Sequence, residues 1–156
     1  GLCYNNREQK DDGSDSVLIA VVDGQGGGIG KTIIEKLRER LGDDAEILAL
    51  GTNALATSLM LRAGANEGAT GENAVAVNVP HADVIVGSVA IVAANSMRGE
   101  LTPRMARAIA ESPAEKVLIP LNRCRINIMG VNGKPLPHYV DDTVNFVQNL
   151  IRRNDP

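Results

Sequence analysis

One segment of the sequence has the residue types and spacing of an anion site: Asp23-Gly24-Gln25-Gly26-Gly27-Gly28-Ile29-Gly30-Lys31-Thr32. It follows a continuous apolar run at residues 17–22, typical of a strand buried on both faces, and precedes an amphipathic helical pattern. Glycines at such a junction let the backbone approach a phosphate, and the helix start adds free N–H groups. The pattern predicts a phosphate site formed by residues Gly24, Gln25, Gly26, Gly27, Gly28, Ile29, Gly30 and Lys31. The alternative is a tight turn with close helix–sheet packing.

The glycine spacing indicates which phosphate compound to expect. Gly24-x-x-x-Gly28-Ile29-Gly30 is similar to the GxxxGxG loop of short-chain dehydrogenases, which implies NAD(P) or another nucleotide as ligand. The sequence departs from that family at Asp23, where those enzymes usually have Thr. A carboxylate beside a pyrophosphate is repulsive unless backbone donors hold it.

Two further departures concern the ribose and the chemistry. The second predicted strand ends in Leu50-Gly51-Thr52-Asn53, without the acid that holds the ribose about 20 residues beyond the loop in NAD domains. The family's catalytic TyrxxxLys is missing, because Thr143 stands four residues after Tyr139. We therefore expect no hydride transfer by that mechanism, and we expect Thr52 or Asn53 to contact the ribose.

Two alternative functions remain open. Gly30-Lys31-Thr32 resembles the end of a P-loop, in which Lys contacts the β- and γ-phosphates and Thr holds magnesium. However, Gln25 stands where the first P-loop glycine belongs, and no later predicted strand ends in the acid of a magnesium site. The first alternative is a phosphate-handling enzyme, such as an NTPase, that uses Lys31 and Thr32. The second is a structural or regulatory oligomer in which the loop is only a turn.

Other polar residues follow predicted strands, where ligands of parallel sheets bind. Arg123 and Arg125 follow the strand expected at 116–121, and either is able to hold a phosphate or carboxylate; Arg123 is the predicted ancillary cation. Cys124 between them is an inert thiol in the simpler interpretation and a nucleophile in the other. Further candidates for polar contacts are Ser88, Asn95 and Glu100. His81 and His138, the only two histidines, have no metal-ligand spacing, and no metal is expected.

Strands and helices alternate along the chain. After the first strand and a helix that ends at Gly42, the pattern predicts strands at 45–50, 66–70, 83–87 and 116–121, with one more at 126–131. It predicts helices at 54–63, 72–79 and 103–111, and a last helix that begins at Pro137. Residues 1–16 show neither the periodicity of a helix nor that of a strand. They are expected to be a flexible lead-in to a single domain at 17–156.

At the level of the whole chain, three segments carry a resemblance: VVDGQGGGIGK, DVIVG…GELTP and VLIPLNRC. Together they look like a family of uncharacterised bacterial Rossmann-like proteins, a domain of unknown function, over residues 17–131. The resemblance and the element order imply an α/β fold, a three-layer Rossmann-like sandwich with a mainly parallel sheet of about five to six strands.

Composition limits the partners. The chain has 156 residues, a formal net charge of −3, one Phe, two Tyr and no Trp. It therefore lacks the basic groove and the aromatic rings with which proteins bind single-stranded nucleic acid.

The apolar run at 84–94 is too short for a membrane span of about 20 residues. Two cysteines without CxxC spacing suit a reducing cytoplasm. The expected partner is a small nucleotide or phosphate ligand; in the oligomer alternative it is further copies of the same chain, as a homo-oligomer.

Overall fold

The computed structural model describes residues 16–121 and 124–154. The lead-in expected at 1–16 lies outside the described residues except for Ser16, and so does Arg123.

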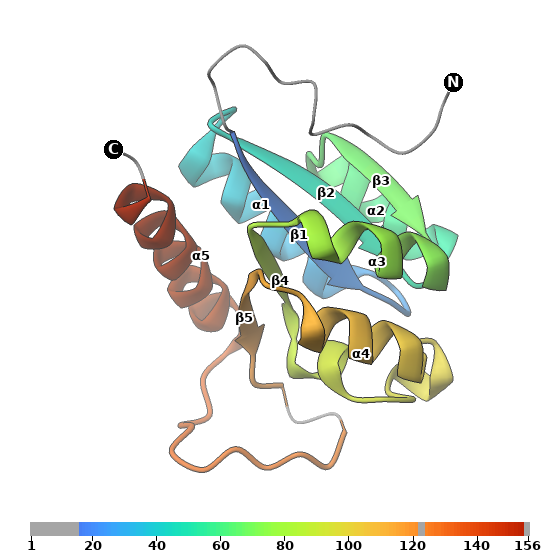
Figure 1. Ribbon diagram of the computed structural model, residues 1–156. Coiled ribbons are helices and arrows are strands. Elements are labelled where there is room, and N and C mark those ends of the chain that lie inside the picture. Colours follow the sequence, from blue (N-terminus) through green and yellow to red (C-terminus); the bar gives the residue numbers. More distant parts are fainter. Residues whose placement is uncertain (1–15, 122–123, 155–156) are drawn as a thin grey trace, which may run out of the picture.

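Five parallel strands form one sheet (Figure 1). In chain order they are β1 (Val17–Asp23), β2 (Ala45–Gly51), β3 (Glu67–Thr70), β4 (Val84–Ser88) and β5 (Glu115–Ile119). In the sheet they lie in the order β3-β2-β1-β4-β5. The chain thus proceeds from β1 toward one edge and later returns to the other side of β1. Such a reversal opens a crevice at the carboxyl ends of β1 and β4, which is where parallel sheets bind ligands.

Helices cover both faces of the sheet, and the expected three-layer Rossmann-like sandwich is confirmed (Figure 1). One face is covered by α1 (Gly28–Leu41), α2 (Ala54–Ala63) and α5 (Leu136–Arg153). The other face is covered by α3 (Glu72–Asn78) and α4 (Pro103–Glu111). None of the helices in the described ranges combines the length and apolarity needed to cross a membrane.

The central strand β1 is buried on both faces, as its unbroken apolar run predicts. Ile19 and Val21 belong to the core beneath α1, α2 and α5, whereas Leu18, Ala20 and Val22 belong to the core beneath α3 and α4. Successive side chains of a strand point to opposite faces. The strand therefore anchors both layers and fixes the position of the glycine loop at its carboxyl end.

The chain after β5 differs from expectation. The strand predicted at 126–131 is wrong: none of these residues forms a strand, and Ile126, Ile128, Met129 and Val131 are exposed. Their alternating pattern finds no neighbouring strand, and Gly130, at φ 85°, turns the chain instead. β5 also ends at Ile119, two residues earlier than predicted, because Pro120 has no N–H to donate to the sheet.

Arg38 joins three elements near the amino-terminal edge of the sheet. Its guanidinium donates to the carbonyl oxygens of Gly64 at 2.7 Å, Gly42 at 2.8 Å and Ala45 at 3.0 Å. It also donates to the side chain of Asn66. Arg38 thereby holds the ends of α1 and α2 against the start of β2.

Arg38→Met should lower the free energy of unfolding by about 2 kcal/mol, because hydrogen bonds from a charged donor contribute about 1.5–3 kcal/mol. The measurement is urea denaturation at neutral pH. The control is Arg40→Met on the same helix, where the exposed arginine makes one hydrogen bond to Asn145, and its effect should stay within about 0.5 kcal/mol. Equal losses in the two variants would contradict the role given to Arg38.

Candidate functional site

The carboxyl group of Asp23 organises the glycine loop. Asp23 is the buried last residue of β1. Its Oδ1 accepts from the Gly24 amide at 2.8 Å, and its Oδ2 accepts from the Gly30 amide at 2.7 Å. Gly30 lies in the first turn of α1, whose amides have no partner within the helix. Asp23 therefore ties the end of the strand to the start of the helix, and backbone donors hold both of its oxygens.

Gly27 and Gly30 are among the glycines that the geometry of the loop requires. Gly27 has φ 74°, and a methyl group there would lie 2.8 Å from Ala56 Cα. At Gly30 a methyl would lie 2.5 Å from Met60 Sδ and 3.0 Å from Asp23 Cβ. By contrast, a methyl on Gly26 or Gly28 meets no atom of the described residues within 4 Å. The packing explanation therefore accounts for Gly27 and Gly30 but not for Gly26 and Gly28.

Three amides of the loop remain available. The Gln25 amide donates to Glu100 Oε1 at 2.9 Å, and the Gly27 amide donates to the Gly24 carbonyl at 2.9 Å. Within the described part of the chain, no acceptor faces the amides of Gly26, Gly28 and Ile29. The latter two lie at the start of α1, where the helix dipole favours an anion.

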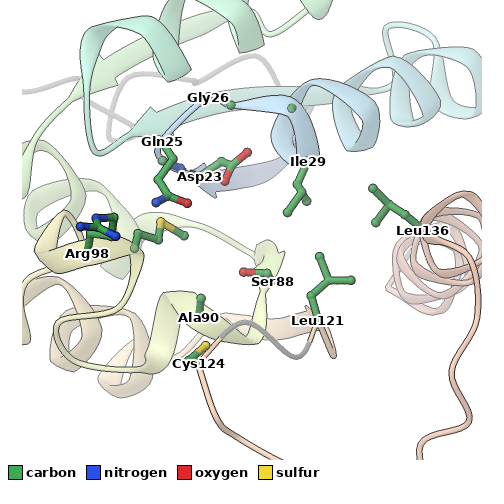
Figure 2. Close-up of a pocket in the computed structure, with 14 residues that line it drawn as sticks. Asp23, Gln25, Gly26, Ile29, Ser88, Ala90, Arg98, Leu121, Cys124 and Leu136 are labelled. Atoms are coloured by element: carbon green, nitrogen blue, oxygen red, sulfur yellow. Dashed lines mark hydrogen bonds between the residues drawn. The ribbon is translucent and has the colours of Figure 1, made fainter.

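A cavity of about 510 Å³ opens in front of these amides. It lies at the carboxyl ends of β1, β4 and β5, beside the start of α5 (Figure 2). Ile29, Leu121 and Leu136 lie at one end, Gln25 and Arg98 at the other, and Ser88 between them. The full lining is Asp23, Gly24, Gln25, Gly26, Gly27, Gly28, Ile29, Ser88, Ala90, Met97, Arg98, Leu121, Cys124 and Leu136. The volume is within the range of about 300–1,000 Å³ typical of small-molecule sites.

Ser88 places a hydroxyl in the cavity. The residue ends β4 and is only 6 % exposed. Nothing in the described ranges hydrogen-bonds to its Oγ, which points toward the end of the cavity where Gln25 and Arg98 lie (Figure 2). The hydroxyl is thus accessible from the cavity, where it is able to donate to or accept from a polar ligand.

Arg98 supplies a cation from a strained loop. It lies in the 3₁₀ turn η4 (Met97–Gly99), and its exposed side chain has no acceptor among the residues that the structure describes. Both Met97, at φ 55°, and Arg98, at φ 56°, are in the left-handed region, as is Gln25 at φ 49°. Such conformations cost of order 1–3 kcal/mol each and gather at functional sites. All three residues line the cavity.

Several sequence-predicted residues lie elsewhere. Lys31 Nζ is 3.9 Å from Glu35 Oε1, and the Thr32 hydroxyl donates to the Gly28 carbonyl at 2.9 Å. Neither residue lines the cavity. Thr52 and Asn53 do not line it either, although Asn53 caps α2 as expected by accepting from the Ala56 amide at 2.9 Å.

Of the remaining candidates, Ser88 and Cys124 line the cavity, while His81, His138 and Arg125 are exposed and do not. The sequence reasoning missed Met97, Arg98 and Leu136. Arg98 carried one weak signal, a cation before a glycine in the loop that follows β4. Among the described residues, no group of three or more His, Cys, Asp or Glu side chains is placed to hold a metal ion.

A comparison with protein families shows which family the chain belongs to. A family model described as "Domain of unknown function (DUF3842)" matches residues 18–152. The chain belongs to this family. The expected membership of an uncharacterised family is confirmed, and the match reaches beyond residue 131, to which the resemblance extended. No curated protein and no solved structure matches the chain significantly.

In this DUF3842 chain, Glu100 closes the loop on the side of β2. Its Oε1 accepts from the Gln25 amide at 2.9 Å, from Thr52 Oγ1 at 2.7 Å and from Asn53 Nδ2 at 2.7 Å. These hydrogen bonds, that of Gln25 foremost, hold the pKa of the Glu100 carboxyl below its ordinary value of 4.5, against a small opposing effect of burial. Glu100 is therefore ionised at neutral pH and joins the loops after β1, β2 and β4.

Glu100→Gln should lower the free energy of unfolding at neutral pH by about 0.5–1 kcal/mol, because the charged acceptor is lost at a site open to solvent. Since folding lowers the pKa of Glu100, its contribution is fully present above pH 4.5 and is lost as the pH falls through the folded-state pKa. The difference between wild type and variant, measured by urea denaturation across this range, should shrink toward acid pH. Glu111→Gln on α4 is the control, and a difference that grows in acid would contradict the assignment.

Proposed function

We propose that this DUF3842 protein binds a nucleotide and holds its phosphate at the start of α1. The observation that carries the proposal is the cavity of about 510 Å³ that opens in front of the amides of Gly26, Gly28 and Ile29. A cavity, a helix start and unpaired amides at the switch point of a parallel sheet are the arrangement in which such folds bind phosphate compounds.

The charges around the cavity support an anionic ligand. Among the described residues of the lining, Arg98 is the cation and Asp23 is the acid. Backbone amides hold both oxygens of Asp23, so its carboxyl group is engaged with the loop itself. A phosphate in front of the loop would therefore receive N–H donors from the backbone and a charge-assisted hydrogen bond from Arg98.

The other walls suit the remainder of a nucleotide. Ile29, Leu121 and Leu136 provide aliphatic surface, and none of the described lining residues carries an aromatic ring. The base would accordingly be held by aliphatic packing, and the Ser88 hydroxyl would provide a polar contact. NAD(P), the cofactor expected from the glycine spacing, and mononucleotides are both candidates within this proposal. Lys31 and Thr32, which the phosphate-handling alternative needs, lie outside the lining.

The direct test is a thermal shift and calorimetric titration of the full chain with nucleoside monophosphates, NAD and inorganic phosphate. Binding to the folded state raises the melting temperature according to RT ln(1 + [L]/Kd). We expect a saturable rise with at least one nucleotide. Absence of any shift at millimolar concentration of every compound would overturn the proposal.

Gly28→Ala separates the binding role of the loop from a role in turning alone. The added methyl meets no protein atom, so stability should be unchanged or higher by up to about 1 kcal/mol. Nucleotide affinity, measured by calorimetry, should nevertheless fall about ten-fold or more, equivalent to about 1.4 kcal/mol, because the methyl crowds the phosphate donors. Gly133→Ala is the matched control, as its methyl is equally unhindered and lies outside the cavity. Unchanged affinity in Gly28→Ala would count against phosphate binding at this helix start.

Arg98→Asn tests the cation. Asn tolerates the left-handed region better than most residues, so the variant should be as stable as wild type or slightly more stable. Nucleotide affinity should fall about ten-fold, with the loss largest at low ionic strength. Arg125→Asn is the control, because Arg125 is also exposed and left-handed, at φ 55°, but does not line the cavity. Equal effects of the two substitutions would remove Arg98 from the site.

A further inference from the structure

Three side chains fill the space between the ends of β1 and β2. A methyl group on Gly24 would collide with Thr52 Oγ1 and would lie 2.7 Å from Met97 Sδ and 3.2 Å from Glu100 Oε1. The glycine is thus needed for the close approach of these side chains from the loops after β2 and β4. Even a methyl group does not fit over Gly24 on this side of the glycine loop.

Hydrogen bonds hold two of these three side chains, those of Thr52 and Glu100, in place. One oxygen of Glu100 takes the backbone donor of Gln25 and the side-chain donors of Thr52 and Asn53. These are the donors that a ribose or a second phosphate over β2 would require. A ligand group entering here would have to displace the carboxylate, and a phosphate would also be repelled by its negative charge.

The cavity instead extends to the opposite side of β1. Beyond the glycine loop, its lining comes from the end of β4, from the chain after β5 and from the start of α5: Ser88, Ala90, Leu121, Cys124 and Leu136. Neither Thr52 nor Asn53 takes part. Ser88, a residue only 6 % exposed whose hydroxyl opens into the cavity without a partner among the described residues, also lies on this side, beneath the glycine loop (Figure 2).

We infer that the ligand is a mononucleotide whose phosphate lies at the start of α1 and whose nucleoside extends over the carboxyl ends of β4 and β5. Glu100 is the residue that determines this specificity, because it occupies the β2 side that a dinucleotide with a second nucleoside over β2 would use. The inference rests on the proposed function and differs from the expectation that Thr52 or Asn53 contacts a ribose.

The first experiment compares ligands of the two sizes. Wild-type protein is titrated calorimetrically with AMP, GMP, CMP, UMP and NAD, and the best mononucleotide should bind about ten-fold or more tightly than NAD. In Glu100→Ala the β2 side is open, and this preference should fall to about three-fold or less, mainly through tighter binding of NAD. Glu111→Ala on α4, which removes an exposed acid outside the cavity, should keep the wild-type preference.

The second experiment does not depend on a Glu100 variant. Cys3 and Cys124 are the only cysteines, so Cys3→Ser leaves Cys124 as the single thiol. Cys124 is half-buried and lines the β5 side of the cavity. Saturation with the best mononucleotide should slow alkylation of Cys124 by iodoacetamide about ten-fold, because the bound nucleotide would cover the thiol in nearly all protein molecules.

The outcomes distinguish this inference from the proposed function. If no compound binds, the proposed function fails and the inference fails with it. If NAD binds wild-type protein as tightly as the best mononucleotide, or if a bound mononucleotide leaves Cys124 alkylation unchanged, nucleotide binding stands and the inference is overturned. A strong mononucleotide preference together with protection of Cys124 supports both.

Discussion

The hydrogen bonds from Gly24 and Gly30 to the carboxyl group of Asp23 are the interaction on which the site depends. They bring the end of the central strand against the first turn of α1 and thereby fix the curvature of the loop between them. Because Asp23 uses the amide of Gly30 and leaves those of Gly28 and Ile29, it also decides which donors face the cavity. Asp23 would repel a phosphate if its carboxylate were free. In this geometry its hydrogen bonds to Gly24 and Gly30 shape the loop instead.

The loop after β4 completes the site with opposite charges placed two residues apart. Arg98 faces the cavity, whereas Glu100 turns away from it to bind the loops after β1 and β2. The left-handed backbone at Met97 and Arg98 makes this separation possible within one short turn. Hydrogen bonds across the turn, among them Asn95 N to Leu101 O at 2.8 Å, hold the strained conformation. The loop therefore places a positive charge on the cavity side of β1 and a negative charge on the β2 side.

Local patterns predicted most of the fold. The apolar run of β1, the Asn53 cap of α2 and the Thr102-Pro103 start of α4 each carry their own physical signal, and the structure has elements at these places. The strand predicted at 126–131 fails because alternation shows only that a segment suits a sheet, not that a neighbouring strand is present. Pro120 ends β5 early because proline has no N–H to donate to the sheet, a signal that is present in the sequence.

The candidate site was predictable only in part. The glycine loop stands out because its spacing is local, whereas Glu100 meets Gln25 across 75 positions of sequence, a contact that no periodicity encodes. The same holds for Arg98, whose place in the cavity depends on left-handed backbone at residues that seldom adopt it. Thr52 and Asn53 were placed correctly after β2, but what binds them is a carboxylate of the protein itself.

The most direct test of the account is an NMR titration of the ¹⁵N-labelled chain with the mononucleotide that binds best. The account predicts that the amide signals of Gly26, Gly28 and Ile29 shift most and saturate together, because a phosphate accepts from them. The Gly30 amide, bonded to Asp23 throughout, should shift much less. Saturable shifts centred on Thr52 and Asn53, or equal shifts at Gly28 and Gly30, would contradict the claim that Asp23 leaves three amides open for an anion.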